Sequence, residues 1–504
     1  MFFKLHSAAP AGLGCMPVDV EVDIHKGQSA FTVVGLPDTS IHEAKDRIYS
    51  ALKNSGFTYP FNFRILVNLA PADTHKEGPA YDLPMAVGLI VVSNKIETDL
   101  GDALFVGELA LDGSVRHING ALPIALFAKN QGLKKIFLPE ANAAEASLVE
   151  GIAIMPVRHL KQIIDHLTGV QTIHAYQTTV PNYTQKTSAY DLDMALIKGQ
   201  DFVKRALEIA ASGAHNVLMS GPPGSGKTLL AKSFPSILPQ LTPEETLEVT
   251  AIYSTAGMLQ HNYITQRPFR SPHHTASIVS LVGGGKYPRP GEISLAHRGV
   301  LFLDEFPEFS RSALESLRQP LEDGVITVAR AKSVLTFPAR FILIASQNPC
   351  PCGMRSDPEK QCICSPTQVH HYQKKLSGPL LDRIDLHVEV PRVPFEKLSS
   401  EQMSESSTNI RERVEAARER QSHRFKNRQI YCNSEMGNAD IKEFCTLDEE
   451  SINLLRTAVT QLHLSARSYN RILKLARTIA DLAKRDKICL EHIAEALQFR
   501  TKIE

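Results

Sequence analysis

One stretch of the chain, GPPGSGKT at residues 221–228, has the residue types and spacing of a phosphate-binding loop. An apolar run, 216–220, precedes it and a helical pattern follows it, so strand, loop and helix come in the required order. Glycines allow backbone N–H groups to surround a phosphate at a helix N-terminus, where the helix dipole favours anions. We therefore predict a nucleotide site formed by Gly221, Pro222, Pro223, Gly224, Ser225, Gly226, Lys227 and Thr228.

Two carboxylates follow a second apolar run, residues 300–303, as Asp304 and Glu305. Adjacent acids at the end of a strand are favourable only where a cation lies nearby. We predict that Thr228 and Asp304 hold Mg²⁺ and that Lys227 neutralises the β- and γ-phosphates of ATP. Glu305 is the candidate that polarises the attacking water.

A third apolar run, residues 341–345, is followed by Asn348. An asparagine at such a place commonly caps a turn. Because it comes after both nucleotide motifs, we predict that Asn348 orients water against the γ-phosphate.

Four of the eight cysteines are crowded into a C-x-C, nine residues and a second C-x-C: Cys350, Cys352, Cys362 and Cys364. In a reducing compartment such a cluster indicates a metal site before a disulfide framework. Four thiolates fit a tetrahedral structural Zn²⁺ site. The C-x-C spacing is unusual for zinc, and reduced loop cysteines are the alternative.

The elements that must position these residues form several domains, because 504 residues exceed one compact core. Mixed strand and helix patterns predict an α/β domain at 1–168, and a polar, Thr-rich stretch predicts a linker at 169–190. Apolar strands separated by helices predict a parallel sheet at 191–395, with ligands at its C-terminal edge. Charged amphipathic patterns predict helices at 396–504.

The composition is that of a globular protein, with 43% hydrophobic and 22% charged residues and a formal net charge of +1. Any nucleic-acid surface must therefore be local. No stretch approaches the roughly 18 apolar residues of a membrane helix, and the first residues lack the features of a signal peptide. We expect a cytoplasmic protein that does not use a membrane as a partner.

The motif order over residues 191–504 resembles that of the AAA+ ATPases. In that family an arginine finger reaches into the neighbouring subunit's site, and an arginine of the lid contacts the γ-phosphate. LLDRID names Arg383 as the finger, and LSAR names Arg467 as the lid arginine, with Arg471 as the competing choice. The resemblance implies a ring, most simply a homo-hexamer.

Residues 324–337 predict a β-hairpin with a basic tip that carries Arg330 and Lys332. The hairpin resembles the pre-sensor hairpin of the MCM helicases and of the magnesium chelatase ATPases. In the helicases it points into the ring pore and brings a basic residue to the DNA backbone. The resemblance implies that Arg330 and Lys332 contact the phosphates of single-stranded and branched DNA. The alternative is an ordinary solvated hairpin tip.

Residues 76–86, KEGPAYDLPMA, resemble the active-site segment of the Lon proteases, and the similarity continues across most of residues 1–168. Lon enzymes use a serine activated by a lysine. The serine position is Ala80 here, and the lysine position falls near Ile124. We therefore expect a Lon-protease-like fold without peptidase activity, which serves as a ring or DNA-binding platform.

Both halves together resemble the ComM/YifB family of magnesium-chelatase-like AAA+ proteins, through SPHHTAS, NPCPCG and SGPLLDRIDLHVEVPRV among other segments. The resemblance implies an α/β protein with a Lon-like N-terminal domain, a P-loop ATPase core with a parallel sheet and pre-sensor hairpin, and a helical C-terminal lid. The implied function is an ATP-dependent hexameric DNA motor. It would promote branch migration, as a helicase, while homologous DNA is integrated in natural transformation.

Two alternatives remain open. One is an ATPase subunit of magnesium chelatase, although the D-x-S-x-S metal-adhesion motif of that enzyme's partner subunit is absent from this sequence. The other is a nucleotide-gated scaffold for recombination proteins. The basic hairpin does not decide between a scaffold and a motor.

Overall fold

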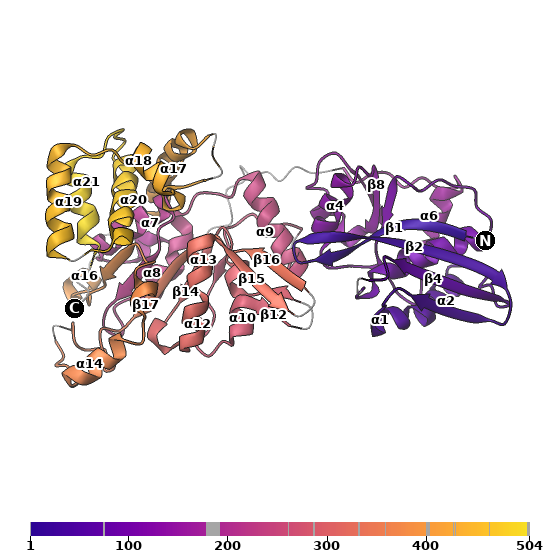
Figure 1. Cartoon of the computed structure of the whole chain (residues 1–504), viewed down its shortest axis with the longest axis horizontal. Coiled ribbons are helices and arrows are strands. Elements are labelled where there is room, and N and C mark those ends of the chain that lie inside the picture. Colours follow the sequence, from indigo (N-terminus) through magenta and orange to yellow (C-terminus); the bar gives the residue numbers. More distant parts are fainter. Residues whose placement is uncertain are drawn as a thin grey trace. The chain divides into compact units, whose positions relative to one another are not determined.

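A computed structural model describes residues 2–500 apart from 74–75, 178–191, 261, 286–287, 331–332, 358, 400–403, 427, 429 and 463. The chain forms two compact units, whose elements are labelled in Figure 1. Unit 1 consists of residues 1–184 and 243–264, and unit 2 consists of residues 185–242 and 265–504. The predicted linker, 169–190, lies outside the described residues from position 178 onward.

A mixed seven-stranded sheet organises unit 1, in the order β3-β4-β2-β1-β5-β8-β9. Strand β2 pairs antiparallel with both β1 and β4, whereas β5, β8 and β9 continue the sheet in parallel with β1. The two short strands β6 and β7 form a separate antiparallel pair. The strand bounds are Phe2–Ala11 (β1), Gly14–Lys26 (β2), Ala30–Val34 (β3), Phe63–Ala70 (β4), Ala103–Phe105 (β5), Glu108–Leu109 (β6), Val115–Arg116 (β7), Lys135–Pro139 (β8) and Ala153–Val157 (β9).

Helix α3 is apolar on all sides, and nearly all of it is buried, as expected for a helix at the centre of a domain. Its core is shared with residues of β1, β2, β4 and α6. The helix bounds are Thr39–His42 (α1), Ala44–Asn54 (α2), Asp82–Ser93 (α3), Ala121–Asn130 (α4), Glu140–Ala146 (α5), Leu160–Leu167 (α6) and Pro243–Ala256 (α9).

Helix α9 belongs to unit 1 although it lies far along the chain. Its Ala251 is buried in one hydrophobic cluster with Leu122 and Ala125 of α4. The Gly120 N–H, at the start of α4, donates to the Ser254 carbonyl (3.2 Å) and to its hydroxyl (3.1 Å). A segment between two ATPase motifs therefore folds with the N-terminal residues, which the sequence pattern did not indicate.

Unit 2 contains the predicted parallel sheet, with five strands in the order β11-β14-β17-β10-β18. Strands β10, β14 and β17 are almost continuously apolar and buried, as is typical of parallel strands covered on both faces. Their C-terminal ends meet at one edge, since Ser220 is in register with both Gln347 and Glu389. The strand bounds are Val217–Ser220 (β10), Phe269–Arg270 (β11), Val300–Leu303 (β14), Ile342–Gln347 (β17) and Leu386–Glu389 (β18).

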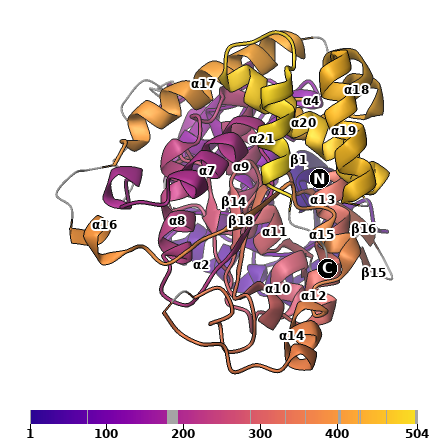
Figure 2. The same cartoon turned by 90° about the vertical axis from the view of Figure 1, so that its left-hand side faces the viewer.

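The C-terminal helices α17, α20 and α21 share one hydrophobic core with α7 and the parallel sheet, and Figure 2 shows this group of helices from one end. The described part of residues 396–500 is thus mainly helical, as predicted, within the same compact unit as the sheet. The helix bounds in unit 2 are Asp201–Gly213 (α7), Lys227–Ser233 (α8), Ile278–Val282 (α10), Glu292–Leu295 (α11), Arg311–Ser316 (α12), Arg318–Asp323 (α13), Pro366–Gln373 (α14), Gly378–Leu381 (α15), Phe395–Ser399 (α16), Ser407–Arg424 (α17), Asn438–Phe444 (α18), Glu449–Gln461 (α19), Ala466–Leu482 (α20) and Leu490–Gln498 (α21).

Two short hairpins extend unit 2. One pairs β12 (Gly283–Gly284) with β13 (Arg289–Pro290), and the other pairs β15 (Val325–Arg330) with β16 (Ser333–Pro338). The second is the hairpin predicted from residues 324–337, and its backbone register runs from Val325 opposite Pro338 to Arg330 opposite Ser333. Among the described helices, none has the length and apolar character needed to cross a bilayer.

Candidate nucleotide site

The phosphate-binding loop lies between β10, which ends at Ser220, and α8, which begins at Lys227. Gly224 and Gly226 have φ angles of +79° and +93°, a region that strains residues with a side chain. A Cβ on Gly221 would lie 2.2 Å from the Val390 carbonyl oxygen. The glycines of the motif are therefore required by the backbone path of the loop.

Lys227 lies inside this loop with its side chain largely buried. Its Nζ donates to the carbonyls of Gly221 (2.6 Å) and Pro222 (3.0 Å) and lies 3.4 Å from Oδ1 of Asn348. Burial lowers the pKa of Lys227, and the Asp304 carboxylate opposes that shift. The structure thus brings the two residues predicted to face the phosphates, Lys227 and Asn348, to the same point.

Asp304 joins the loop to the neighbouring strands. The Thr228 hydroxyl donates to its Oδ2 (2.9 Å), and the Ser346 hydroxyl and the Glu305 N–H donate to its Oδ1, the latter at 3.1 Å. A hydroxyl and a carboxylate at one point are the hard oxygen ligands that Mg²⁺ prefers. The donor set of Thr228 and Asp304 therefore fits the predicted magnesium ion.

Glu305 follows Asp304 in a left-handed conformation, with a φ of +53°, and its carboxylate is more than half exposed. Its Oε2 lies 3.3 Å from Nδ1 of His274. The sequence offered only the vicinal pair His273-His274, which by itself does not indicate a site. The sequence did not indicate the contact between His274 and Glu305, because the two residues follow the C-terminal ends of different strands.

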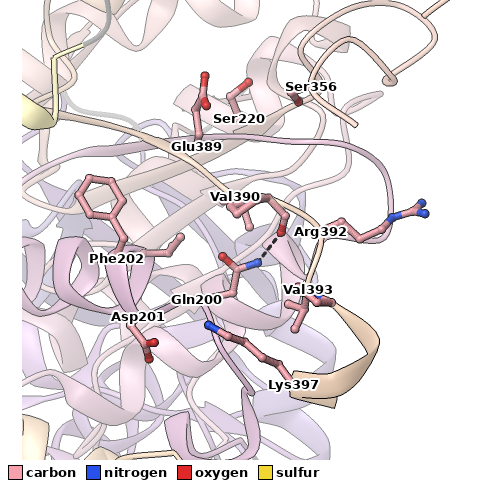
Figure 3. A pocket seen from close by; sticks show the side chains of 13 residues that line it. Gln200, Asp201, Phe202, Ser220, Ser356, Glu389, Val390, Arg392, Val393 and Lys397 are labelled. Atoms are coloured by element: carbon pink, nitrogen blue, oxygen red, sulfur yellow. Dashed lines mark hydrogen bonds between the residues drawn. The ribbon is translucent and has the colours of Figure 1, made fainter. Parts of the chain in front are cut away.

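A cavity of about 500 Å³ adjoins the phosphate loop and is lined in part by Ser220, the residue before Gly221 (Figure 3). The Gln200 amide, just before α7, crosses its wall and donates to the Pro391 carbonyl (2.5 Å). The side chains of Phe202, Val390 and Lys397 also face it in Figure 3. Its volume falls within the usual range for ligand pockets, roughly 300–1,000 Å³. This cavity was not predicted, because its walls come from segments almost 200 residues apart.

The two candidate arginines of the ring and lid meet at one carboxylate. Arg383 donates to Oε2 of Glu322, on α13, and Nη2 of Arg467 lies 3.5 Å from Oε1. Arg383 is buried, and burial followed by nearby arginines, chiefly Arg467, lowers its pKa. Arg471, the competing lid arginine, instead pairs with the buried Asp385.

The four clustered cysteines converge as predicted. Their sulfur atoms all lie within 4.8 Å of one another, with Sγ–Sγ distances of 3.4 Å for Cys350–Cys352 and 3.6 Å for Cys352–Cys362. Hydrogen bonds from the backbone N–H groups of Met354 and then Ile363 lower the pKa of Cys352 to about 6. Four sulfur ligands at these separations can hold one metal ion.

Comparisons with known proteins cover the whole chain. Family models described as "Subunit ChlI of Mg-chelatase", "Magnesium chelatase, subunit ChlI" and "Magnesium chelatase, subunit ChlI C-terminal" match residues 20–142, 193–398 and 404–500. An uncharacterized protein YifB of Escherichia coli is 44% identical over 98% of this chain and 96% of its own. A competence protein ComM of Haemophilus influenzae is 42% identical over 99% and 97%. This chain belongs to the ComM/YifB family.

A relative outside the ComM/YifB family matches less of the chain. The magnesium-chelatase 67 kDa subunit of Chlorobaculum parvum is 29% identical over 157 residues, which are 30% of this chain and 23% of that protein. The chain is therefore related to magnesium chelatase through the family models and this partial match, and over nearly its full length it matches YifB and ComM.

Two residues of this ComM/YifB chain, Arg330 and Lys332, are predicted to contact DNA. Arg330 is the last residue of β15, and its side chain is outside the description, as is Lys332 altogether. The paired backbone places Arg330 opposite Ser333 at the end of the β15–β16 ladder.

The Lon-like positions lie in unit 1. Ala80 belongs to the single helical turn Pro79–Tyr81 before α3, and Ile124 is fully buried in α4. The methyl group of Ala80 cannot act as a nucleophile, and an apolar Ile124 cannot act as its base. The nearby buried carboxylate, Asp82, is held by Arg47 through two hydrogen bonds of 2.7 and 3.0 Å.

Proposed function

We propose that this chain is an ATP-driven DNA motor, which assembles as a homo-hexamer in the cytoplasm and promotes branch migration. The setting is the integration of homologous DNA in natural transformation. The observation that carries the ATP-driven part is the convergence of Lys227, Asn348, Thr228 and Asp304 at the end of the parallel sheet. The 42% identity to a competence protein over nearly the full length supports the setting.

The roles within the nucleotide site follow from the side chains. The base of ATP would enter the cavity beside Gln200, and the phosphates would face the loop from Gly221 to Thr228. Mg²⁺, held by Thr228 and Asp304, would neutralise phosphate charge. Glu305 accepts a proton from the attacking water, and Asn348 orients that water.

Ring assembly would complete the site. Arg383 of one subunit supplies positive charge to the γ-phosphate bound by its neighbour, while Arg467 acts from the lid. Both arginines share Glu322 in this chain, so nucleotide binding next to a neighbour would exchange that partner for phosphate.

DNA contact is assigned to the hairpin tip with Arg330 and Lys332. Two cations at a turn suit phosphate contacts without base reading. Binding of single-stranded and branched DNA should be nearly independent of sequence and should weaken steeply with salt. Recombination proteins are the further partners that this setting implies.

Zinc is the metal proposed for Cys350, Cys352, Cys362 and Cys364, as a structural ion. The four-sulfur set matches structural Zn²⁺ sites, which keep no open position for catalysis. Metal analysis of the purified protein should find about one zinc per chain, and its absence would remove this part of the proposal.

One observation favours the alternative function, an ATPase subunit of magnesium chelatase. Three family models described by that enzyme's subunit match this chain. A scaffold for recombination proteins would use the same nucleotide site without translocation. Both alternatives predict ATP hydrolysis without movement of a DNA junction.

The deciding experiment is ATP-dependent branch migration of a labelled three-strand junction, with Glu305→Gln as the inactive variant. Movement by the wild-type protein, and none by the variant, is the expected result. Hydrolysis without movement would overturn the motor and direct the next test to porphyrin and to recombination proteins. Glu308→Gln is the matched control, because Glu308 lies three residues after Glu305 in the sequence and makes a surface ion pair with Lys375.

A further inference from the structure

The segment that carries the four cysteines, residues 350–364, is part of the wall of the nucleotide site. We call it the cysteine loop. It begins two residues after Asn348, whose Oδ1 lies 3.4 Å from Nζ of Lys227. It then contacts the site at two further places, one beside the phosphates and one beside the cavity.

The first contact joins the cysteine loop to the phosphate loop. Gly353 follows Cys352 with a φ of +79°, and a Cβ built on it would lie 2.6 Å from Cδ and 2.8 Å from Cγ of Pro223. Only a residue without a side chain can approach so closely. Pro223 is the second proline of the phosphate-binding motif, so the two loops pack directly on each other.

The second contact is at the cavity. Ser356 of the cysteine loop lines it together with Arg392 (Figure 3). Two acids of the same loop hold that arginine, since Nη2 lies 3.3 Å from Asp357 and Nη1 lies 2.8 Å from Glu359. A displacement of the cysteine loop would therefore change both the phosphate end and the cavity end of the site.

The helix that follows the cysteine loop also contacts Asn348. The Asn348 backbone makes a hydrogen bond with the hydroxyl of Tyr372, on helix α14, which directly follows Cys364. Asn348, two residues before the cysteine loop, is thus in contact with the helix that follows the loop. In the described part of the loop, Cys350 and Cys352 contact Cys362 and Cys364 through their sulfur atoms.

We propose that metal occupancy of the four cysteines sets the affinity of the nucleotide site, because the bound ion holds the cysteine loop against Pro223 and Arg392. This rests on the proposed ATPase and zinc sites, and it adds an energetic coupling between them. Linkage requires the coupling to be reciprocal, so bound nucleotide must also raise the affinity of the four cysteines for the metal by the same factor. That reciprocal effect can be measured without catalytic turnover.

The test titrates the purified full-length protein with a chromogenic zinc chelator of known affinity and measures the zinc transferred at equilibrium, with and without ADP and Mg²⁺. We expect ADP to raise the zinc affinity about tenfold, within the usual range of coupling between sites. Removal of zinc should weaken ADP binding by a similar factor, measured by calorimetry on protein whose near-ultraviolet circular dichroism is retained.

Two variants separate coupling from folding. Lys227→Ala weakens the phosphate contact but leaves the cysteines intact. The variant should therefore keep its zinc, and ADP should no longer change its zinc affinity. Gly353→Ala forces the cysteine loop away from Pro223, so it should keep its zinc yet bind ADP about tenfold more weakly. Gly378→Ala is the matched control, because a Cβ there meets no atom within 4 Å.

Equal zinc affinity with and without saturating ADP would overturn the coupling while leaving the ATPase proposal standing. Normal ADP affinity in the Gly353→Ala protein would overturn it as well. Failure of the wild-type protein to bind ADP would count against the proposed function itself, which distinguishes the two failures.

Discussion

The Thr228 hydroxyl donates a 2.9 Å hydrogen bond to the Asp304 carboxylate, across 76 residues of sequence. This contact joins the first turn of α8 to the end of β14 at the place where Mg²⁺ is proposed to bind. Thr228→Ala should raise the Mg²⁺ concentration needed for half-maximal ATP hydrolysis about 10- to 100-fold, as loss of one oxygen at a metal site commonly does.

Thr228→Ser is the matched control, since it keeps the hydroxyl and should stay near the wild-type value. The measurement is a magnesium titration of phosphate release at saturating ATP. A Thr228→Ala protein with the wild-type magnesium requirement would mean that the hydroxyl serves only to hold Asp304 in place.

Arg383 and Lys227 should act on the same ATP molecule from different subunits. Arg383→Ala should lower hydrolysis about 10³-fold or more, the usual contribution of an arginine finger. Lys227→Ala should also be inactive, yet a mixture of the two variants should recover hydrolysis, because some interfaces then combine an intact loop with an intact arginine. An inactive mixture that forms mixed rings would show that Arg383 acts within its own chain.

Arg467 and Arg471 should respond differently to removal of their charge. Arg471 pairs with Asp385, a buried carboxylate that also lies 3.4 Å from His215. Arg471→Ala leaves that charge unpaired and should cost about 3–5 kcal/mol of folding stability. Arg467 is mostly exposed, so Arg467→Ala should change stability by less than about 0.5 kcal/mol while slowing ATP hydrolysis.

Thermal unfolding of both variants, paired with phosphate release, checks this assignment. Loss of hydrolysis in a stable Arg467→Ala protein would identify the lid arginine. If Arg471→Ala were as stable as wild type, the ion pair with Asp385 would not hold the C-terminal helices to the sheet.

The arrangement of the candidate nucleotide site was largely predictable because each of its parts has a local signature. A buried parallel strand is a continuous apolar run, and the polar residue after it must lie at the C-terminal edge of the sheet. That rule placed Asp304 and Asn348 beside the phosphate loop. The sequence could predict that the four cysteines lie close together, because two C-x-C motifs nine residues apart have little freedom to separate.

The features that sequence did not indicate depend on contacts between distant segments. Gln200 reaches the Pro391 carbonyl across 191 residues, and no local pattern marks either residue as a cavity wall. Helix α9 has apolar and polar residues on all sides, so its sequence does not tell which unit it packs against. Its place in unit 1 follows from Ala251 and Ser254, whose partners on α4 lie about 130 residues earlier.

Glu145 on α5 makes unit 1 sensitive to pH. Burial raises the pKa of its carboxyl to about 7, and hydrogen bonds from Asn142 and Ser254 only partly oppose that shift. The folded protein therefore holds a proton that the unfolded chain releases near its ordinary pKa of 4.5. The contribution of Glu145 to the free energy of unfolding is fully present below pH 4.5. It is lost as pH rises towards 7, by about 3 kcal/mol in total.

Glu145→Gln removes this titration while keeping an amide that can accept the Asn142 hydrogen bond of 2.7 Å. The variant should gain stability relative to wild type as pH rises from 5 to 8, measured as the difference in Tm at each pH. Glu140→Gln, an exposed position on the same helix, should show no such trend. A constant difference between Glu145→Gln and wild type at both pH values would show that Glu145 is ionised in the folded protein at pH 5, with its charge compensated by Asn142 and Ser254.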